Sequence, residues 1–414
     1  MKKYLCWLLL VLLLLGGCAQ KAPVVSGAVG VTVHLQGEDE TPLPAVEGYE
    51  DFMAVLSAAL IDGQSNKNLS PVSVYIALSM AAEGARGETR AELLALLGEQ
   101  SLEELRNSVE GLLNSLHLTG ETGELMLANS LWMGAQDGTA SFHEAYLDVL
   151  KTSYGAEANA VRFGEAAAGE RIKAWIEEKT RDKIKVSEDA MDFDANTLAV
   201  LLNTIYLRDQ WRVPFDRALT EQGVFYGPEG ERQAEYMRRT EYDGTVFRGE
   251  GYLRYALPLN EAGAMVFVLP DEGTALESLL GSPEQIEELL QGGDKVFAEV
   301  DLMVPRFSFQ DRTDLEETLM FLGVRTCFTD GADFSLMTDA PMCVSRVLQE
   351  SCIGVDEAGV VAAAYTLIAF TKGMAIPVAR ERVDFHLIRP FLYAIESRDG
   401  TILFLGTVTA PDQA

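Results

Sequence analysis

The segment between Val355 and Thr371 constrains this chain most, because it has the composition of a strand but no tight turn follows it. It begins with acidic residues and passes through Gly359, whose backbone is free to bend, into a run of small side chains. Successive residues of a strand lie on opposite faces. One face would hold only small or apolar side chains: Val360, Ala362, Ala364, Thr366, Ile368 and Phe370. The segment therefore predicts a strand-competent loop that can enter a sheet, and a buried strand followed by a surface loop is the alternative.

The order of helix and strand patterns predicts one large α+β domain. The 414 residues are 48% hydrophobic, which is enough for a large core, and no Gly/Ser/Pro-rich linker divides the interior. Helices are predicted over 52–60, 71–84, 142–149 and 169–179, and after the capping boxes that begin at Thr89 and Ser101. Strands are predicted over 124–132, 198–207, 252–257, 264–269, 296–304, 344–355, 391–396 and 402–408. Because helices mostly come first and strands later, an α+β arrangement is favoured.

The amino terminus has the pattern of an export signal. Two lysines precede an apolar run, Leu5 to Leu15, which is short for a bilayer span. Leu15-Gly16-Gly17-Cys18 resembles a bacterial lipobox, which implies cleavage before Cys18 and a lipid on its thiol, and an ordinary signal peptide is the alternative. We expect a signal peptide at 1–17, a flexible tether at 18–46 and a folded domain at 47–414. The product would be lipid-anchored to the outer face of the cell membrane or to the outer membrane, facing the extracellular space.

Charge and cysteine content narrow the class of partner. The net charge of −30 would repel nucleic-acid phosphates, so no nucleic-acid partner is expected. Once Cys6 and the lipobox cysteine are set aside, the remaining three cysteines cannot form a closed disulfide framework, and their spacing matches no zinc pattern. Cys327, Cys343 and Cys352 are expected to be buried small hydrophobes. No metal and no cofactor are predicted.

Five further pieces of sequence, in the same order along the chain, resemble the serpin family. They are Asn68-Leu69-Ser70-Pro71 with Ser73, Ala128-Asn129-Ser130-Leu131-Trp132, Leu202-Asn203-Thr204-Ile205-Tyr206 with Trp211 and Pro214-Phe215, Ala332-Asp333-Phe334-Ser335, and Phe385 with Pro390-Phe391. The opening segment resembles the reactive loop of that family, and the likeness runs from about Tyr49 to Pro411. It implies a serpin-like α+β fold, with helices packed on three β-sheets and a mobile reactive-centre loop over about 357–382. Serpin loop insertion is an established example of strand addition.

The resemblance assigns two groups of residues to the movement of a sheet. The hinge comprises Glu357, Gly359, Val360, Ala362, Ala363, Ala364 and Thr366, and the shutter and breach comprise Ser70, Ser73, Asn203, Gln349 and Trp211. Gln349 stands where the family usually has histidine, and an amide both donates and accepts, so the network can persist without its pH-sensitive member. Ala358, Val360 and Tyr365 also depart from the usual hinge. Val360 is compact and uncharged, so it still suits a sheet interior.

The resemblance also indicates where a protease would cut. Counting forward from Glu357 leads to Gly373-Met374, whereas counting back from Pro390 leads towards Ala379. The candidate positions are Lys372, Gly373, Met374 and Ala375. Cleavage after Lys372 would imply a trypsin-like target. The small and apolar surroundings favour the Met374–Ala375 bond and an elastase- or chymotrypsin-like target.

No enzyme motif accounts for this chain. His143-Glu144 begins like a zincin motif, but Leu147 occupies the place of its second histidine, and neither a G-x-S-x-G elbow nor a P-loop is present. We therefore expect no catalytic residues. The chain would be a monomeric suicide inhibitor that forms a covalent complex with a target serine protease, with a cysteine protease as a second target class. The alternatives are a non-inhibitory serpin that binds a ligand or chaperones a partner at the cell surface, and a structural or adhesive lipoprotein, which the ordered motifs disfavour.

Overall fold

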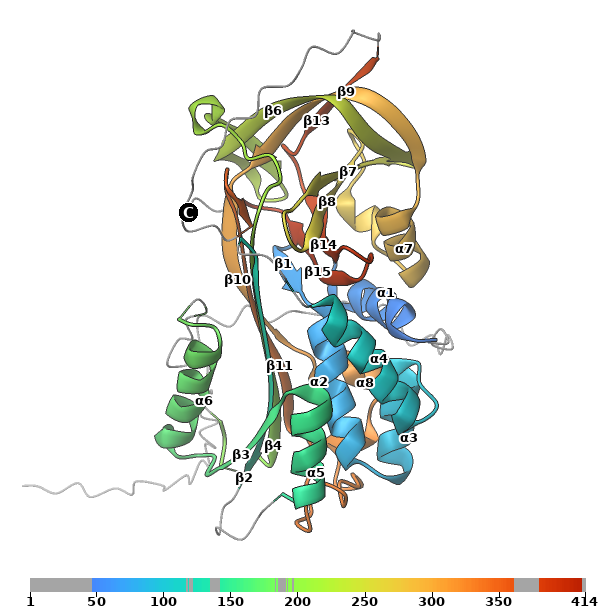
Figure 1. Cartoon of the computed structure of the whole chain (residues 1–414), viewed down its shortest axis with the longest axis vertical. Coiled ribbons are helices and arrows are strands. Elements are labelled where there is room, and N and C mark those ends of the chain that lie inside the picture. The colour runs from blue at the N-terminus through green and yellow to red at the C-terminus, as the bar shows by residue number, and fades with distance from the viewer. Residues whose placement is uncertain are drawn as a thin grey trace, which may run out of the picture. The chain divides into compact units, whose positions relative to one another are not determined.

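The computed structural model describes residues 47–411, apart from 117, 119–121, 135–141, 183, 185–190, 192, 196 and 361–379. All of the described residues belong to one compact unit of the chain. Their strands form a six-stranded and a nine-stranded sheet, and helices lie on both faces of the six-stranded sheet (Figure 1). The α+β class expected from the sequence is confirmed.

The six-stranded sheet has the order β10-β11-β12-β4-β2-β3. These strands are β2 (Glu124–Gly134), β3 (Glu157–Val161), β4 (Ala199–Gln210), β10 (Phe307–Asp314), β11 (Arg346–Val355) and β12 (Gly359–Val360). β4 is antiparallel to β2 and parallel to β11. Residues from Ala199 to Leu207 are all buried, because helices cover both faces of this strand and its apolar run has no solvent side.

Eight α-helices lie in the described part of the chain. They are α1 (Tyr49–Leu60), α2 (Pro71–Gly84), α3 (Gly87–Leu97), α4 (Leu102–Ser115), α5 (Glu144–Val149), α6 (Ala166–Lys179), α7 (Pro283–Gln291) and α8 (Glu316–Phe321). Every residue of α2 is buried, which its small and apolar composition allows. α6 packs Ile172, Trp175 and Ile176 against Trp132 of β2 and Val200 of β4 in a separate core cluster. In Figure 1, α6 and α2 therefore lie on opposite faces of the sheet.

The nine-stranded sheet has the order β1-β15-β14-β8-β7-β6-β9-β13, with β5 paired to β6. Its strands are β1 (Lys67–Leu69), β5 (Glu221–Gly227), β6 (Gly230–Gly249), β7 (Tyr252–Pro258), β8 (Gly263–Pro270), β9 (Asp294–Pro305), β13 (Glu381–His386), β14 (Phe391–Ser397) and β15 (Ile402–Val408). We expected three sheets. Among the described residues hydrogen bonding joins the strands into two, because the 20-residue β6 pairs with β5 at one end and β7 at the other.

The structure confirms most of the elements expected from periodicity and corrects one cap. The hairpins β7–β8 and β14–β15 and the helix starting at Pro71 lie where they were predicted. Ser101 caps α4, since its Oγ accepts a hydrogen bond from the Glu104 backbone N–H at 3.2 Å. The capping box at Thr89 was wrong: α3 already begins at Gly87, and the Thr89 hydroxyl accepts a hydrogen bond from the Asp333 N–H instead.

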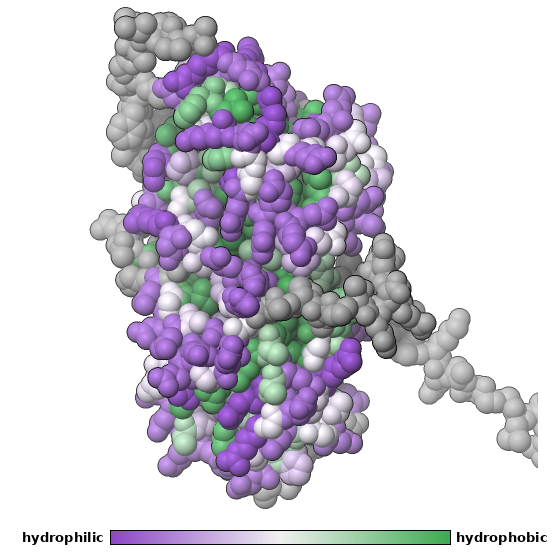
Figure 2. Space-filling view, turned by 90° about the vertical axis from the view of Figure 1, so that its right-hand side faces the viewer, coloured by the Kyte–Doolittle hydropathy of each residue, from purple (hydrophilic) through white to green (hydrophobic). Residues whose placement is uncertain are grey.

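The visible surface is mostly hydrophilic. Figure 2 shows hydrophilic side chains over most of the visible face, with smaller apolar areas between them. Within the described residues, no helix is both long and apolar enough to cross a membrane.

Candidate functional site

The hinge begins as a strand that lies between β4 and β11. In β12, Val360 pairs antiparallel with Val355 of β11 on one side and with Asp209 of β4 on the other. Val360 is fully buried in the main core. Further along, β4 and β11 pair directly with each other, from Val200–Ile205 to Arg346–Ser351. The sheet is therefore parted at one end, where β12 has entered, and closed along the rest of the ladder.

Gly359 has a steric role at this entrance. The sequence suggested that this glycine supplies backbone freedom, but its φ is not among the positive values of the described glycines. A Cβ at this position would lie 2.0 Å from the Asp209 carbonyl oxygen and 2.7 Å from the Gln210 Cα. Glycine is thus required because β12 approaches the backbone of β4 too closely for any side chain.

Buried polar contacts fix the turn between β11 and β12. Glu357 is 3% exposed, and its carboxylate accepts a 2.6 Å hydrogen bond from the Thr220 hydroxyl. Its other oxygen lies 3.5 Å from Nε of Arg306 and 3.8 Å from Nε of Arg217. The Asp356 carboxylate accepts from the N–H groups of Ala358 and Gly359, while burial raises the pKa of this carboxyl. These contacts hold the first residues of the hinge in one conformation.

Trp211 joins the turn to the end of β4. Its backbone N–H donates to the Ala358 carbonyl at 2.9 Å, and its indole Nε1–H donates to the Asp356 carbonyl at 2.8 Å. The ring is 1% exposed and packs edge-on against Phe215. Trp211 thus lies beside the hinge, and it is also one of the largest fully buried side chains of the core.

A row of amide side chains crosses the closed part of the sheet. Asn129 of β2 is directly opposite Asn203 of β4, which is directly opposite Gln349 of β11. Asn203 Nδ2 donates to the Ser73 carbonyl at 2.9 Å and to Asn129 Oδ1, and the Ser73 hydroxyl donates to Asn203 Oδ1. This amide row (Asn129, Asn203 and Gln349) therefore joins three strands to the first turn of α2.

Gln349 takes up both ends of its amide. Its Oε1 accepts from the Ser70 N–H at 3.0 Å, and its Nε2 donates to the Ser70 carbonyl at 2.9 Å and to the Ser73 hydroxyl at 3.1 Å. The structure thus brings together Ser70, Ser73, Asn203 and Gln349. Ser70 is the N-cap residue of α2, but within the described residues its Oγ has no hydrogen-bond partner. The other side-chain groups of these four residues have hydrogen-bond partners, as buried polar groups generally require.

Sequence reasoning missed several residues of the site. Asn129 lies within the segment 128–132 that resembles the serpin family, but only the strand register shows that its side chain meets Asn203. Thr220, Arg217 and Arg306 meet Glu357 from distant segments, and no local pattern marks them.

Several other predicted positions lie outside the described residues. These are hinge positions Ala362, Ala363, Ala364 and Thr366, the bulky Tyr365, the candidate bond at Lys372 to Ala375, and Cys18. Of the three cysteines expected to be buried, Cys327 is buried, whereas Cys343 and Cys352 are half-buried, and none of the three forms a disulfide bond within the described residues.

A strained ion pair lies on the opposite face of β11 from the amide row. Glu350 is 7% exposed, and its Oε1 lies 3.3 Å from Nε of Arg312 without hydrogen-bond geometry. Burial raises the pKa of the Glu350 carboxyl to about 7, although the Arg312 charge opposes this shift. Burial likewise lowers the pKa of Arg312. The pair therefore leaves a poorly stabilised charge on β11, one of the two strands between which β12 lies.

Comparison with known proteins identifies the family to which this architecture belongs. A family model described as serpin (serine protease inhibitor) matches residues 47–411. Alpha-1-antiproteinase S of Cavia porcellus is 32% identical over 358 residues, which cover 84% of this chain and 85% of the relative. The crystal structure of Serpin48 from the insect Tenebrio molitor is similar with a TM-score of 0.76 and 27% identity, covering 88% of this chain and 97% of that one. Human thyroxine-binding globulin in complex with thyroxine gives a TM-score of 0.76 at 26% identity, covering 88% and 98%.

The chain belongs to the serpin family. The description of this family is of serine protease inhibitors in general rather than of catalysts, which supports the expectation of a protein that is not an enzyme at the level of the family.

The amide row generates a stability prediction. Asn203→Ala should lower the free energy of unfolding by at least about 2 kcal/mol, because the buried groups of Ser73 and Asn129 would lose their partner. The matched control is Asn159→Ala, since Asn159 is a half-buried amide on β3 of the same sheet and should cost less than about 1 kcal/mol. Urea unfolding measures both. Equal losses in the two variants would show that the row does not hold the strands together.

The Glu350 carboxyl generates a pH prediction. A pKa raised in the folded state means that this group favours folding below its unfolded value and that the benefit is lost as pH rises through about 7. In Glu350→Gln, the fall in unfolding free energy between about pH 5.5 and pH 8 should be smaller by roughly 2 kcal/mol, at about 1.4 kcal/mol per pKa unit. Glu231→Gln, at an exposed glutamate of β6, is the control. An unchanged pH dependence in Glu350→Gln would contradict the assignment.

Proposed function

We propose that this serpin is a suicide inhibitor of a serine protease. In this proposal the strand that inserts after cleavage is a continuation of β12. A protease takes the loop as substrate and forms an acyl-enzyme through its nucleophile. The loop segment before the cut then extends β12 between β4 and β11 and carries the bound protease with it. The observation that supports this proposal most is Val360, which is fully buried between the two strands at the start of an apolar sequence.

Hydrogen bonding gives the insertion a driving force. β4 and β11 now share one parallel ladder over six residue pairs. A strand that enters antiparallel to both, as β12 does, would replace this ladder by two antiparallel ladders. Parallel pairing is slightly less stable per residue than antiparallel pairing, and the entering backbone groups gain partners. The opposing cost is the separation of Asn203 from Gln349, because the amide row lies across the path of the strand.

The proposed target is an elastase- or chymotrypsin-like serine protease, with a cysteine protease as the second class. This rests on the small and apolar residues around Met374–Ala375 in the sequence, and Lys372 would instead select a trypsin-like enzyme. The inhibitor would act as a monomer, displayed outside the cell by a lipid on Cys18. A non-inhibitory binding function is the second candidate, because a protein of similar structure was solved as a complex with thyroxine.

A covalent complex is the expected outcome with a suitable protease. Incubation with a panel of serine proteases, followed by denaturing electrophoresis, should give a band of summed mass that survives boiling in detergent. Val360→Arg should abolish this band and leave a cleaved chain, because an unpaired charge would have to enter the sheet interior. Val360→Thr is the matched control, since threonine has nearly the same size and should keep the band.

The released carboxy-terminal fragment should also locate the bond. We expect its mass to correspond to a start at Ala375, whereas a start at Gly373 would indicate a trypsin-like target. If the panel cleaves the loop without forming any stable complex, the inhibitory function is wrong and the binding function replaces it.

Lipid anchoring gives a separate prediction. Cys18→Ser should move the protein from the membrane fraction to the soluble fraction, because the thiol that would carry the lipid is lost. Cys6→Ser is the control, since Cys6 lies within the segment expected to be removed. Fractionation followed by immunoblotting measures the distribution. Membrane association that persists in Cys18→Ser would exclude the lipobox as the anchor.

A further inference from the structure

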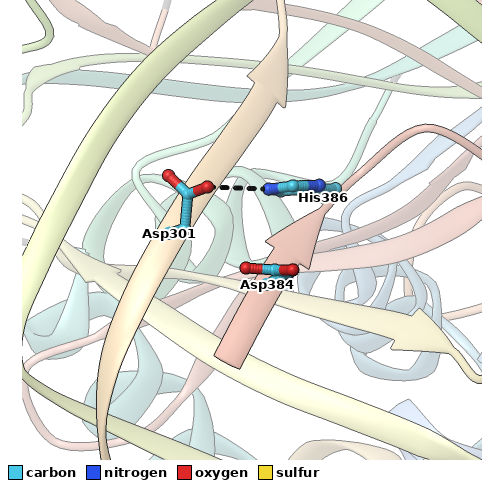
Figure 3. Close-up of side chains that lie close together, drawn as sticks. All are labelled: Asp301, Asp384 and His386. Atoms are coloured by element: carbon cyan, nitrogen blue, oxygen red, sulfur yellow. Dashed lines mark hydrogen bonds and ion pairs between the residues drawn. The ribbon is translucent and has the colours of Figure 1, made fainter. Parts of the chain in front are cut away.

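Two carboxylates and an imidazole converge on the outer face of the nine-stranded sheet. β13 is parallel to β9, and Asp384 lies directly opposite Asp301 in the register. Val383 and Phe385 face the core, so the alternate residues Asp384 and His386 face outward. Figure 3 shows Asp301 and His386 facing each other across an ion pair, with Asp384 beside them.

The donor atoms have the spacing of a metal site that needs only small adjustment. One ligand atom from each of Asp301, Asp384 and His386 lies within 4.8 Å of the others. His386 Nε2 is already 3.2 Å from Asp301 Oδ2. Ligand atoms about 2.0 Å from a tetrahedral zinc ion lie about 3.3 Å from one another. The pair on β9 and β13 therefore already has this separation, and Asp384, which is 63% exposed, is free to close the rest.

The site also has an electrostatic need for a cation. Two carboxylates directly opposite each other on neighbouring strands repel. Arg382 partly neutralises the two carboxylates. Its Nη2 lies 3.3 Å from Asp301 Oδ2, and its Nε lies 3.4 Å from Asp384 Oδ1. The Arg382 side chain is 65% exposed, so it can move into solvent and leave both carboxylates to another cation.

We propose that Asp301, Asp384 and His386 bind a divalent transition-metal ion of the zinc class, with water in the remaining position. The imidazole selects such an ion over calcium or magnesium, which prefer oxygen ligands alone. To bind, His386 presents Nε2 without its hydrogen, and the Arg382 guanidinium leaves the carboxylates. Sequence spacing predicted no metal site, because Asp301 is distant in the chain and joins the other two only through the β9–β13 register.

A bound ion would stabilise the pairing of the edge strand β13 with β9. Among the described residues β13 pairs only with β9, and Arg380 alone separates it in sequence from the segment 361–379. Its present cross-strand attachments include the exposed pairs Arg248–Glu381 and Arg382–Asp301, which contribute little individually. A metal that joins Asp384 and His386 to Asp301 would hold the two strands by coordination. Ligands that bind only the folded state stabilise it by mass action.

Zinc titration of the untagged full chain by calorimetry tests the site. We expect one zinc ion to bind, with affinity about tenfold or more lower in Asp384→Asn and in His386→Gln, the scale on which changes at metal sites act. Arg382→Gln should bind zinc more tightly, because it removes the competing cation. His143→Gln is the matched control, since His143 forms a similar 3.2 Å pair with Asp339 and should leave the affinity unchanged.

Hydrogen exchange with and without zinc should show slower exchange in Glu381–His386. The proposal is overturned if neither the parent chain nor Arg382→Gln binds zinc, or if zinc binds with equal affinity to Asp384→Asn and His386→Gln. It is also overturned if calcium binds as tightly as zinc and is indifferent to His386→Gln. Melting of each variant without metal verifies that it is folded, and Asp384 is exposed enough for Asp384→Asn to keep the fold.

Discussion

The contact between β4 and β11 is the interaction on which the rest of this structure depends. Both strands are buried between α2 and α6, yet they are joined by one parallel ladder and one row of amides. At one end β12 already separates them, and at the other the Asn129, Asn203 and Gln349 side chains hold them to α2. The same sheet is therefore complete in one region and prepared to accept a strand in another.

The two regions differ in the chemistry that holds them. At the entrance, Glu357 is fixed by Thr220 and two arginines, and Gly359 lets two backbones meet where a methyl group would not fit. In the closed region, the amide row makes neutral amide and hydroxyl hydrogen bonds, while Glu350 and Arg312 form an ion pair on the other face of β11. A neutral hydrogen bond contributes less to stability than a hydrogen bond to a charged group, so breaking the amide row costs less than breaking the contacts of Glu357 would. Gln349 is itself a neutral amide, so it contributes no titrating side chain to this network.

The sequence predicted the fold well where local pattern decides the outcome. The buried α2, the two hairpins and the apolar β4 all have periodicity or composition that only one element satisfies. The strand β6 was not predicted, because its 20 residues are rich in arginine and glutamate and are stabilised as a strand by their neighbours. Likewise, Asn129, Arg306 and Asp301 gain their roles only through strand register and packing, which a single sequence does not contain. Four of the hinge residues and the candidate bond lie outside the described residues, so their placement stays a prediction.

The central claim is that the segment after Val360 can become a full strand between β4 and β11, and thermal unfolding of the loop-cleaved chain tests it most directly. A protease that cuts within the loop without being trapped yields the cleaved form for calorimetry. Insertion gives the entering backbone two ladders and buries its apolar face, so the cleaved chain should melt well above the intact one. Equal melting temperatures for the two forms would contradict insertion and would show that β4 and β11 do not accept a further strand between them.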